Sequence, residues 1–422
     1  MTLLSSLLLL IVVARIFGRL FARFNQPELI GEILAGVLLG PAILGLIEPN
    51  AALAAITELA VFLIILSAGL EMRFSDIVQA MKGRGLVLAA LGFLIPFGGG
   101  VVIAVAYELD VMRMVFLGLC ISITALPVAV KLMDGLGILN TPISRFALAT
   151  AVINDVAALF ILGIILNLPE QRTLDDALSA IGVATIKLMV LCAMVLVLNG
   201  LLKWLQNNKV NVQSIPENVI RIFGPEALFG MVVMFVLVFG TVSEALGFHF
   251  VIGAFFGALF LDQKHFMASR YKELQGTLGS ITNGFLAPLF FAYLGLELHP
   301  IAVEDLDFPI VVIVVSVLTK LFAGWWGGRI TGMGHREALG LGAVLNGRGV
   351  MELVVAGIAY QKGFIGPTMF STLVLMGIIT TFLTPILFKQ AMAGKRLQQY
   401  RNRWQAAPGQ PANLPTSSGE PH

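Results

Sequence analysis

Apolar stretches long enough to cross a bilayer as helices recur along most of this chain. A helix needs about 20 apolar residues to span the hydrocarbon core, and it satisfies its own backbone groups there. Thirteen such stretches can be counted, to within about one: 3–20, 27–47, 52–70, 85–107, 112–133, 143–168, 178–202, 227–246, 248–261, 278–298, 308–330, 337–360 and 367–387. Charged residues make up 12% of the chain, about half the fraction found in soluble domains. The sequence therefore predicts an all-α polytopic membrane protein with about 13 transmembrane helices.

Lysine and arginine are distributed very unevenly between the two sides that these spans define. Alternating the loops places 21 of the 27 basic residues on one side and 3 on the other, with 3 inside spans. The sparse side holds Arg113, Arg172 and Lys362, and the residues inside spans are Lys187, Lys320 and Arg348. Because basic loops remain in the cytoplasm, we expect the N-terminus outside and the C-terminus inside. Residues 1–389 then form the transmembrane domain, and the polar stretch 390–422 is expected to be a disordered cytoplasmic tail.

A carboxyl group lies at the middle of the sixth span. Asp155, preceded by Asn154, is roughly 18 Å from either end of a helix over 143–168, too far for its short side chain to reach water. A charge at that depth is costly unless it is paired, hydrated or protonated, and intramembrane acids mostly mark ion or proton paths. Asp155 is therefore the candidate site for a cation or a proton. The alternative is a protonated aspartate that bonds a neighbouring helix.

Two spans contain residues that interrupt a helix at membrane depth. In the fifth span, Pro127 lacks an amide hydrogen and opens the backbone near Ile123, where Ser122 and Thr124 supply oxygens. A simple kink is the alternative there. In the twelfth span, two glycines flank Arg348 in residues 346–349, which favours a second break.

The charges beside the second break suit the helix ends that it creates. Glu352 falls in the first turn of the outer half, where the helix dipole favours a negative charge. Arg348 can then sit against the carbonyls that end the inner half of the same span. A pair between Arg348 and Glu352, four residues apart on one helix face, is the alternative.

The two breaks are seven spans apart, so the helices that carry them run in opposite directions. This spacing predicts an inverted repeat, with repeat one over about 3–168, a linking helix over 178–202 and repeat two over about 227–387. In secondary transporters of this architecture the broken helices cross at the midplane beside the ion site. The small residues of the Asp155 span would permit close crossing there.

Lys320 is a second charge deep in a span. It lies at least ten residues, roughly 15 Å, from either end of 308–330, which is beyond the reach of snorkelling. Its function is either to pair with Asp155 or to titrate during transport, and the alternative is that it neutralises the carbonyl ends of the broken helices. Lys187 is a rival buried cation, although its span could begin late enough for it to reach the outer interface.

Five sequence segments together resemble the monovalent cation:proton antiporter superfamily, in particular its Kef-type and plant cation/proton-exchanger-like branch. The segments are Thr124-Ala-Leu-Pro-Val-Ala-Val-Lys-Leu, Ala151-Val-Ile-Asn-Asp-Val, Pro288-Leu-Phe-Phe-Ala-Tyr-Leu-Gly-Leu-Glu, Leu318-Thr-Lys and Asn346-Gly-Arg-Gly-Val-Met-Glu-Leu-Val-Val. The resemblance implies an NhaA-type fold with a mobile core domain, a dimerisation domain and a homodimer. It implies that Asp155 binds cation and proton alternately, with Asn154 beside it and Lys320 nearby. Full-length Kef proteins also carry a C-terminal nucleotide-binding domain, which this sequence does not show.

The chemistry of the residues leads to the same cycle. A desolvated carboxylate must hold either a proton or a cation, so the two compete for Asp155. Alternating exposure of one site then gives exchange of K⁺ or Na⁺ for protons, with Ser122 and Thr124 as candidate ligands beside Asp155. Lys320, Arg348 and Glu352 are candidates for charge compensation or for proton coupling.

Three further expectations concern the type of transport and the partners. A single central acid favours electroneutral exchange, and relatives with asparagine before the aspartate are typically electroneutral. A cation channel or potassium efflux system is the alternative function, while the absence of a catalytic constellation argues against an intramembrane enzyme. We expect no cofactor and no nucleic acid, and contact with lipid of the bacterial inner (plasma) membrane.

Overall fold

The chain folds into helices in the computed structural model. The structure describes residues 2–24, 26–71, 83–138, 141–165, 214–224, 226–261, 266–301, 305–392 and 397–400, with short stretches between 182 and 204. No strand occurs in these residues. The helices are α1 (Leu3–Arg23), α2 (Glu28–Leu39), α3 (Ala51–Glu71), α5 (Arg84–Ala106), α6 (Val111–Ser122), α7 (Leu126–Gly135), α8 (Pro142–Ile165), α10 (Ser214–Phe223), α11 (Ala227–Ala245), α12 (Phe250–Phe260), α13 (Ala268–Ile281), the π-helical turn η2 (Thr282–Leu286), α14 (Ala287–Leu296), α15 (Asp307–Ile330), α16 (His335–Leu345), α17 (Val350–Gln361) and α18 (Pro367–Ala391).

The described helices include eight that are long and apolar enough to cross a membrane, or nine if α16 and α17 count as one bent span. The all-helical membrane architecture is therefore as predicted. The predicted count of 13 is not reached in the described residues, because α2, α6 and α12 are shorter than a span. Much of the predicted linking helix 178–202 falls outside the described residues. The exact count stays a prediction.

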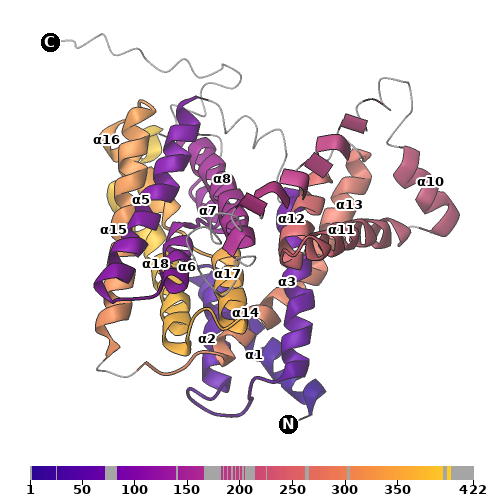
Figure 1. The fold of residues 1–422 in the computed structure, drawn as a ribbon, viewed down its shortest axis with the longest axis horizontal. Coiled ribbons are helices and arrows are strands. Elements are labelled where there is room, and N and C mark those ends of the chain that lie inside the picture. The colour runs from indigo at the N-terminus through magenta and orange to yellow at the C-terminus, as the bar shows by residue number, and fades with distance from the viewer. Residues whose placement is uncertain are drawn as a thin grey trace.

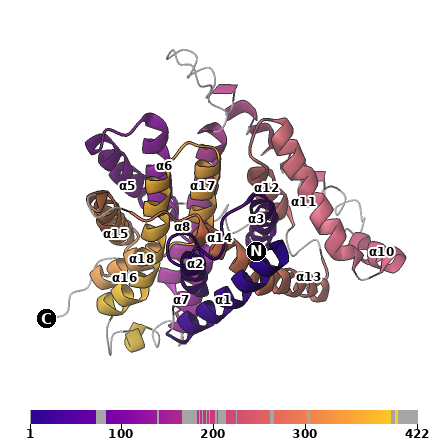
Figure 2. The ribbon, with the colours of Figure 1, turned by 90° about the horizontal axis from the view of Figure 1, so that it is seen from below.

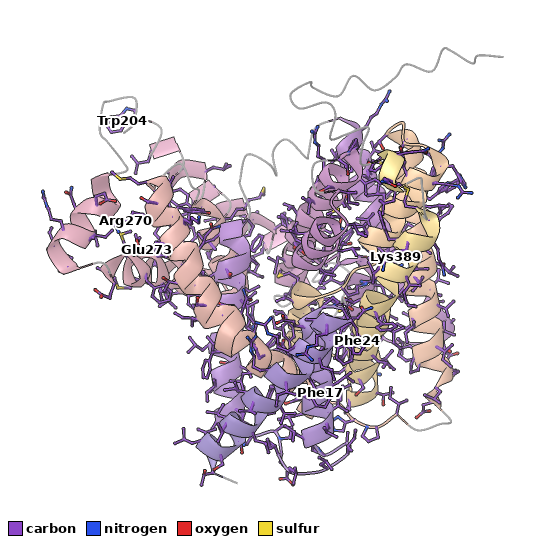
Figure 3. The ribbon with its side chains drawn as sticks, turned by 180° about the vertical axis from the view of Figure 1, so that it is seen from behind. Phe17, Phe24, Trp204, Arg270, Glu273 and Lys389 are labelled. Carbon is purple, nitrogen blue, oxygen red and sulfur yellow. The ribbon has the colours of Figure 1, made fainter. Side chains whose placement is uncertain are left out.

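Two predicted spans have different bounds in the structure. The span over 27–47 is helical only as far as Leu39, because Pro41 disfavours helical backbone at Gly40. The span over 278–298 is part of a longer helix, α13–η2–α14, that runs from Ala268 to Leu296. Arg270 lies on α13, where it pairs with Glu273 of the same helix at 2.9 Å (Figure 3) and with Glu217 of α10 at 3.3 Å.

The helices form two groups that lie side by side in two perpendicular views (Figures 1 and 2). One group packs α15 against α5, α16 and α18, and α5 against α6 and α8. The other packs α2 between α1 and α14, with α3, α12 and α11 following in order. A continuous core of buried apolar side chains from both groups joins them. The broken helices and α8 all belong to the first group, which positions the candidate site.

The same close crossing occurs just before each break. A Cβ atom on Gly100 of α5 would lie 2.5 Å from Gly118 Cα of α6, and one on Gly324 of α15 would lie 2.2 Å from Gly342 Cα of α16. In each case a long helix meets the first half of a broken helix through paired glycines. This recurrence supports the predicted inverted repeat, which remains a proposal.

Part of the stretch predicted to be a disordered tail is ordered. Residues 397–400 form a helical turn, and Tyr400 is buried, with its hydroxyl accepting a hydrogen bond of 3.3 Å from the Ile143 amide at the start of α8. The rest of 390–422 beyond Met392 lies outside the described residues. The start of the Asp155 helix is therefore packed against a residue that follows α18 in the sequence.

We expect Gly36→Ala to destabilise the protein, because α2 and α14 approach too closely for a side chain there. A Cβ on Gly36 would lie 1.8 Å from the carbonyl oxygen of Ala292, and backbone cannot withdraw cheaply. Overpacking of this kind costs about 1–3 kcal/mol or more. Thermal unfolding of the purified protein measures the effect. Gly230→Ala is the matched control, since its Cβ on α11 would meet nothing within 4 Å; equal melting of the two variants would contradict the packing argument.

Candidate functional site

Both predicted helix breaks are present. The first separates α6, which ends at Ser122, from α7, which begins at Leu126. Pro127 falls in the first turn of α7, where an amide hydrogen has no helical partner to lose. The second separates α16, which ends at Leu345, from α17, which begins at Val350, with a bend of 41° between the two.

The two breaks touch and bond to each other. The Ala125 amide in the first break donates to the Gly347 carbonyl in the second at 2.9 Å. The Thr124 hydroxyl donates to the Leu345 carbonyl at 3.1 Å. A Cβ on Gly349 would lie 2.9 Å from the Ala125 Cβ, so a small residue is needed at this crossing. The broken helices therefore cross at their breaks, as the sequence predicts.

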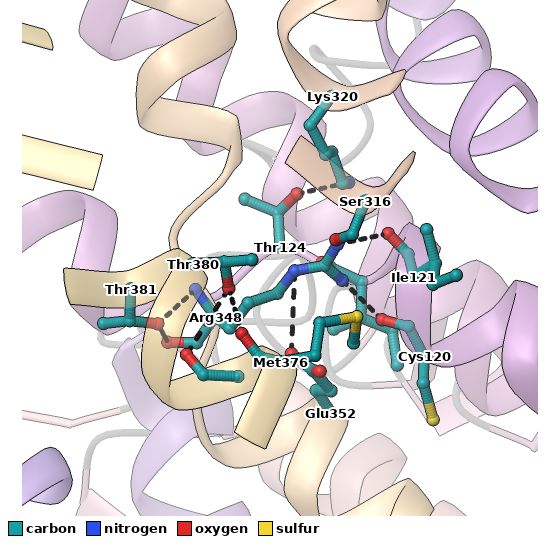
Figure 4. A network of polar contacts seen from close by, with 12 residues as sticks. Cys120, Ile121, Thr124, Ser316, Lys320, Arg348, Glu352, Met376, Thr380 and Thr381 are labelled. Atoms are coloured by element: carbon teal, nitrogen blue, oxygen red, sulfur yellow. Dashed lines mark hydrogen bonds and ion pairs between the residues drawn. The ribbon is translucent and has the colours of Figure 1, made fainter. Parts of the chain in front are cut away.

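Arg348, in the second break, forms hydrogen bonds with the end of α6 (Figure 4). Its guanidinium donates to the backbone carbonyls of Cys120, Ile121 (2.6 Å) and Ile123 (2.9 Å), and to the Ser316 hydroxyl of α15 at 2.6 Å. The sequence-based prediction that Arg348 meets the carbonyls of its own inner half-helix is therefore wrong. The carbonyls are those of the other broken helix, which only the three-dimensional crossing brings into reach. The positive charge lies at the negative end of the α6 dipole.

Glu352 is the only carboxylate among the described residues that pairs with Arg348. Its Oε2 lies 3.7 Å from Arg348 Nε, and both side chains are fully buried. Neither carboxylate oxygen of Glu352 accepts a hydrogen bond, and Arg348 Nε donates none. The Arg348–Glu352 ion pair, predicted from the sequence as an alternative, is present in the first turn of α17. Its 3.7 Å separation is long, and no hydrogen bond joins the two side chains.

Lys320 reaches the same helix end from α15 and is fully buried. Its ammonium group donates to the carbonyls of Gly92 (3.1 Å) and Ser122 and to the Thr124 hydroxyl (2.8 Å). All three acceptors are neutral oxygens. Together with Arg348, Lys320 thus binds four consecutive carbonyls, those of residues 120–123. Lys320 therefore lies at the carbonyl end of a broken helix, and its role in charge neutralisation stays a prediction.

Asn154 and Asp155 lie on α8 beside this end, 0% and 2% exposed. The Asn154 amide nitrogen donates to the Ser122 carbonyl at 3.3 Å, the same oxygen that Lys320 contacts. Asp155 is the next residue along the helix. Asn154 Oδ1 and Asp155 Oδ1 are buried without a hydrogen-bond partner. The predicted site residues are thus brought together, with free oxygens on α8.

The hydroxyl groups of the two residues at the first break are already engaged. Ser122 Oγ lies within hydrogen-bond distance of the Gly118 carbonyl (2.6 Å) and of the Phe93 carbonyl (3.1 Å). The Thr124 hydroxyl accepts from Lys320 while it donates to Leu345. Direct contact of either residue with a cation stays a prediction.

A family model described as sodium/hydrogen exchanger, transmembrane, matches residues 8–392. The chain belongs to this family. It is 26% identical to the Na(+)/H(+)-K(+) antiporter GerN of Bacillus cereus over 92% of this chain and 95% of that one. It is also 26% identical to an Na(+)/H(+) antiporter of Enterococcus hirae, over 92% and 98% of the two chains. Its fold matches that of the sodium proton antiporter MjNhaP1 of Methanocaldococcus jannaschii with a TM-score of 0.69, at 18% identity and over 94% and 98% of the two chains.

This exchanger-family chain has a cavity of about 620 Å³ between its two groups of helices. The lining residues come from α3, α11, α12, α14, α17 and their ends, and the charged ones are Glu58, Glu244 and Lys362. The cavity does not include Asp155.

Sequence reasoning missed several residues that hold the site of this exchanger-family chain together. Thr381 of α18 accepts from the Arg348 amide at 2.9 Å and donates to the Arg348 carbonyl at 3.0 Å. The Ser316 hydroxyl accepts a hydrogen bond from the Arg348 guanidinium, and the Gly92 carbonyl accepts one from Lys320. The only signal for Thr381 was a polar pair, Thr380-Thr381, inside an apolar span. Nothing in the local pattern of Gly92 indicates its partner.

Proposed function

We propose that this protein is a secondary active transporter that exchanges a monovalent cation, K⁺ or Na⁺, for protons by alternating access around Asp155. The observation that carries this proposal is a buried carboxylate with a free oxygen, beside two crossed helix breaks in an exchanger-family fold. A carboxylate excluded from water must bind a proton or a cation. The antiporter names of the relatives from Bacillus cereus and Enterococcus hirae point to the same exchange.

In the proposed cycle Asp155 carries the cation and the proton in turn, and Asn154 keeps α8 in register with the first break. Arg348 and Lys320 compensate the carbonyl end of α6, so the break can exist in an apolar environment. Glu352 balances Arg348. Ser122 and Thr124 hold Lys320 in the state described, and we propose that they approach the cation when the site opens.

The remaining parts of the proposal concern the surroundings. The cavity lies near the outer ends of α3 and α17 in the orientation that the basic loops predict, so we infer that it is the extracellular approach to the site. Asp155 is 2% exposed, which fits alternating access better than the continuous polar pore of a cation channel. We further propose a homodimer in a bacterial inner membrane, with the N-terminus outside and the C-terminus in the cytoplasm.

Transport should be electroneutral, because only Asp155 would change occupancy and one proton would leave for each cation bound. An ammonium group has three N–H donors for the three neutral oxygens around Lys320, so we expect Lys320 to keep its proton during exchange. The measurement is the cation gradient that nulls an imposed pH gradient in liposomes, at two clamped membrane potentials. A potential of 100 mV is worth about 2.3 kcal/mol per charge moved, so a shift of the null point would be large.

A null point that moves with potential would overturn one-for-one exchange and point to a titrating Lys320. In that case Lys320→Arg should restore independence of potential, since arginine keeps its proton. Proton flux scanned over Na⁺, K⁺, Li⁺ and Rb⁺ tests the function itself. Saturable counter-flow supports the antiporter, whereas non-saturating cation conductance without proton coupling would support the channel or efflux alternative.

A further inference from the structure

The carbonyl oxygens at the end of α6, the first half of the first broken helix, already accept hydrogen bonds from other side chains. Arg348 takes the carbonyls of Cys120, Ile121 and Ile123, and the Ser122 carbonyl accepts from both Lys320 and Asn154. A carbonyl has two lone pairs, so that of Ser122 is saturated. Because the positive charges of Arg348 and Lys320 already lie at this helix end, oxygens that no donor engages are the better candidates to bind a cation at Asp155.

Buried oxygens without a partner occur on α8 itself. Thr150 Oγ1, Asn154 Oδ1 and Asp155 Oδ1 all lack a hydrogen-bond partner, and the three residues are at most 2% exposed. Thr150 lies four residues before Asn154, and such residues have their Cβ atoms about 5–6 Å apart on one face of a helix. Three free oxygens thus lie within about one and a half turns of a single helix.

The free hydroxyl of Thr150 is unusual for this protein. A threonine in a helix commonly satisfies its hydroxyl by donating to the carbonyl four residues earlier. Other helical threonines in the described part of the chain do so at 2.7–2.9 Å: Thr241, Thr319, Thr372, Thr380 and Thr384. Thr150 does not bond the Phe146 carbonyl in this way. Its hydroxyl is left available at full burial, which is costly unless something binds it.

The packing of α5 explains how Thr150 is held. Its methyl group lies against Gly92, where an added Cβ would approach Thr150 Cγ2 to 2.9 Å. The Gly92 carbonyl in turn accepts from Lys320 at 3.1 Å. The methyl group of Thr150 is therefore packed against the residue whose carbonyl binds Lys320. The hydroxyl group of Thr150 forms no hydrogen bond with any described residue.

We propose that the Thr150 hydroxyl oxygen is a ligand of the transported cation, joining Asn154 Oδ1 and Asp155 Oδ1 on the α8 side of the bound ion. This inference rests on the proposed function and adds to it a residue that sets cation affinity and selectivity. Na⁺ and K⁺ are hard cations that take oxygen ligands, whereas a proton on Asp155 needs no such shell. Thr150 should therefore act on cation binding and leave proton binding at Asp155 largely unchanged.

The test is the cation dependence of proton flux by Thr150→Val in liposomes. Valine keeps the shape and the methyl packed on Gly92 but removes the oxygen. We expect the KM for the preferred cation to rise about tenfold or more, as for loss of one contact to a charged group, with kcat changed far less and the ranking of Li⁺, Na⁺ and K⁺ altered. Thr150→Ser keeps the oxygen and should restore most of the affinity.

Ser144→Ala is the matched control, because Ser144 is also on α8, fully buried and without a hydrogen-bond partner, but lies about 16 Å along the helix from Asp155. It should leave the KM near the wild-type value. Equal KM values for Thr150→Val and Ser144→Ala would overturn the inference, although wild-type exchange would still uphold the proposed function. No exchange by the wild type would reject the proposed function itself.

A second measurement applies if Thr150→Val does not fold. Thermal stabilisation of purified protein by Na⁺ or K⁺ reports binding without transport, since a ligand of the folded state raises the melting temperature. Thr150→Ala should need about tenfold more cation than Thr150→Ser for the same rise. Identical cation titrations of the two variants would overturn the assignment of Thr150.

Discussion

Replacing Asp155 with asparagine should abolish cation-driven proton flux while leaving the protein folded. The amide has nearly the same shape as the carboxyl group, but it neither releases a proton nor carries the charge that attracts a cation. Asp155 forms no hydrogen bond or salt bridge with another described residue, and its Oδ1 is free, so the neutral variant removes a buried charge without leaving a hydrogen-bond partner unsatisfied. Proton flux in liposomes under an imposed Na⁺ or K⁺ gradient measures the loss.

Asp155→Glu should retain some exchange with altered cation affinity, since the carboxylate remains but moves by one methylene. Glu273→Gln is the control, because it removes a carboxylate that pairs with Arg270 at the protein surface. Surface ion pairs contribute at most about 1 kcal/mol to stability. Robust exchange by a well-folded Asp155→Asn protein would contradict the assignment of Asp155 as the carrier.

The positions of the buried charges and of the helix breaks followed from the sequence because they depend on local information. A count along an apolar span gives the depth of Asp155 and Lys320, and both are buried in the structure. Pro127 and the glycines around Arg348 are local helix breakers, so the breaks at 123–125 and 346–349 could be placed within a few residues.

The partners of these charges depend on the crossing of distant helices, and there the sequence was misleading or silent. Arg348 was assigned to carbonyls near it in the chain, but it binds those of residues more than 220 positions earlier. The bond between Lys320 and the Gly92 carbonyl joins residues that carry no complementary pattern. Span bounds failed for a related reason, because composition does not separate an apolar turn such as 40–47 from a helix.

Replacing Arg348 with alanine should destabilise the protein more than any other single substitution proposed for it. The change leaves the carbonyls of Cys120, Ile121 and Ile123 and the Ser316 hydroxyl without their donor, and leaves Glu352 buried without a counter-charge. Removing one partner of a buried ion pair alone costs about 3–5 kcal/mol. The melting temperature of the purified protein measures the effect, and exchange should be lost with it.

Two further variants separate the sources of that loss. Arg348→Ala combined with Glu352→Gln removes the uncompensated charge but not the orphaned carbonyls, so it should recover only part of the stability. Arg348→Lys keeps a charge but cannot reach four acceptors with one ammonium group, so it should also melt early. Arg270→Ala is the control, because Arg270 is 33% exposed and pairs at the surface. Full recovery in the double variant would show that the ion pair with Glu352, and not the carbonyl end of α6, is what requires Arg348.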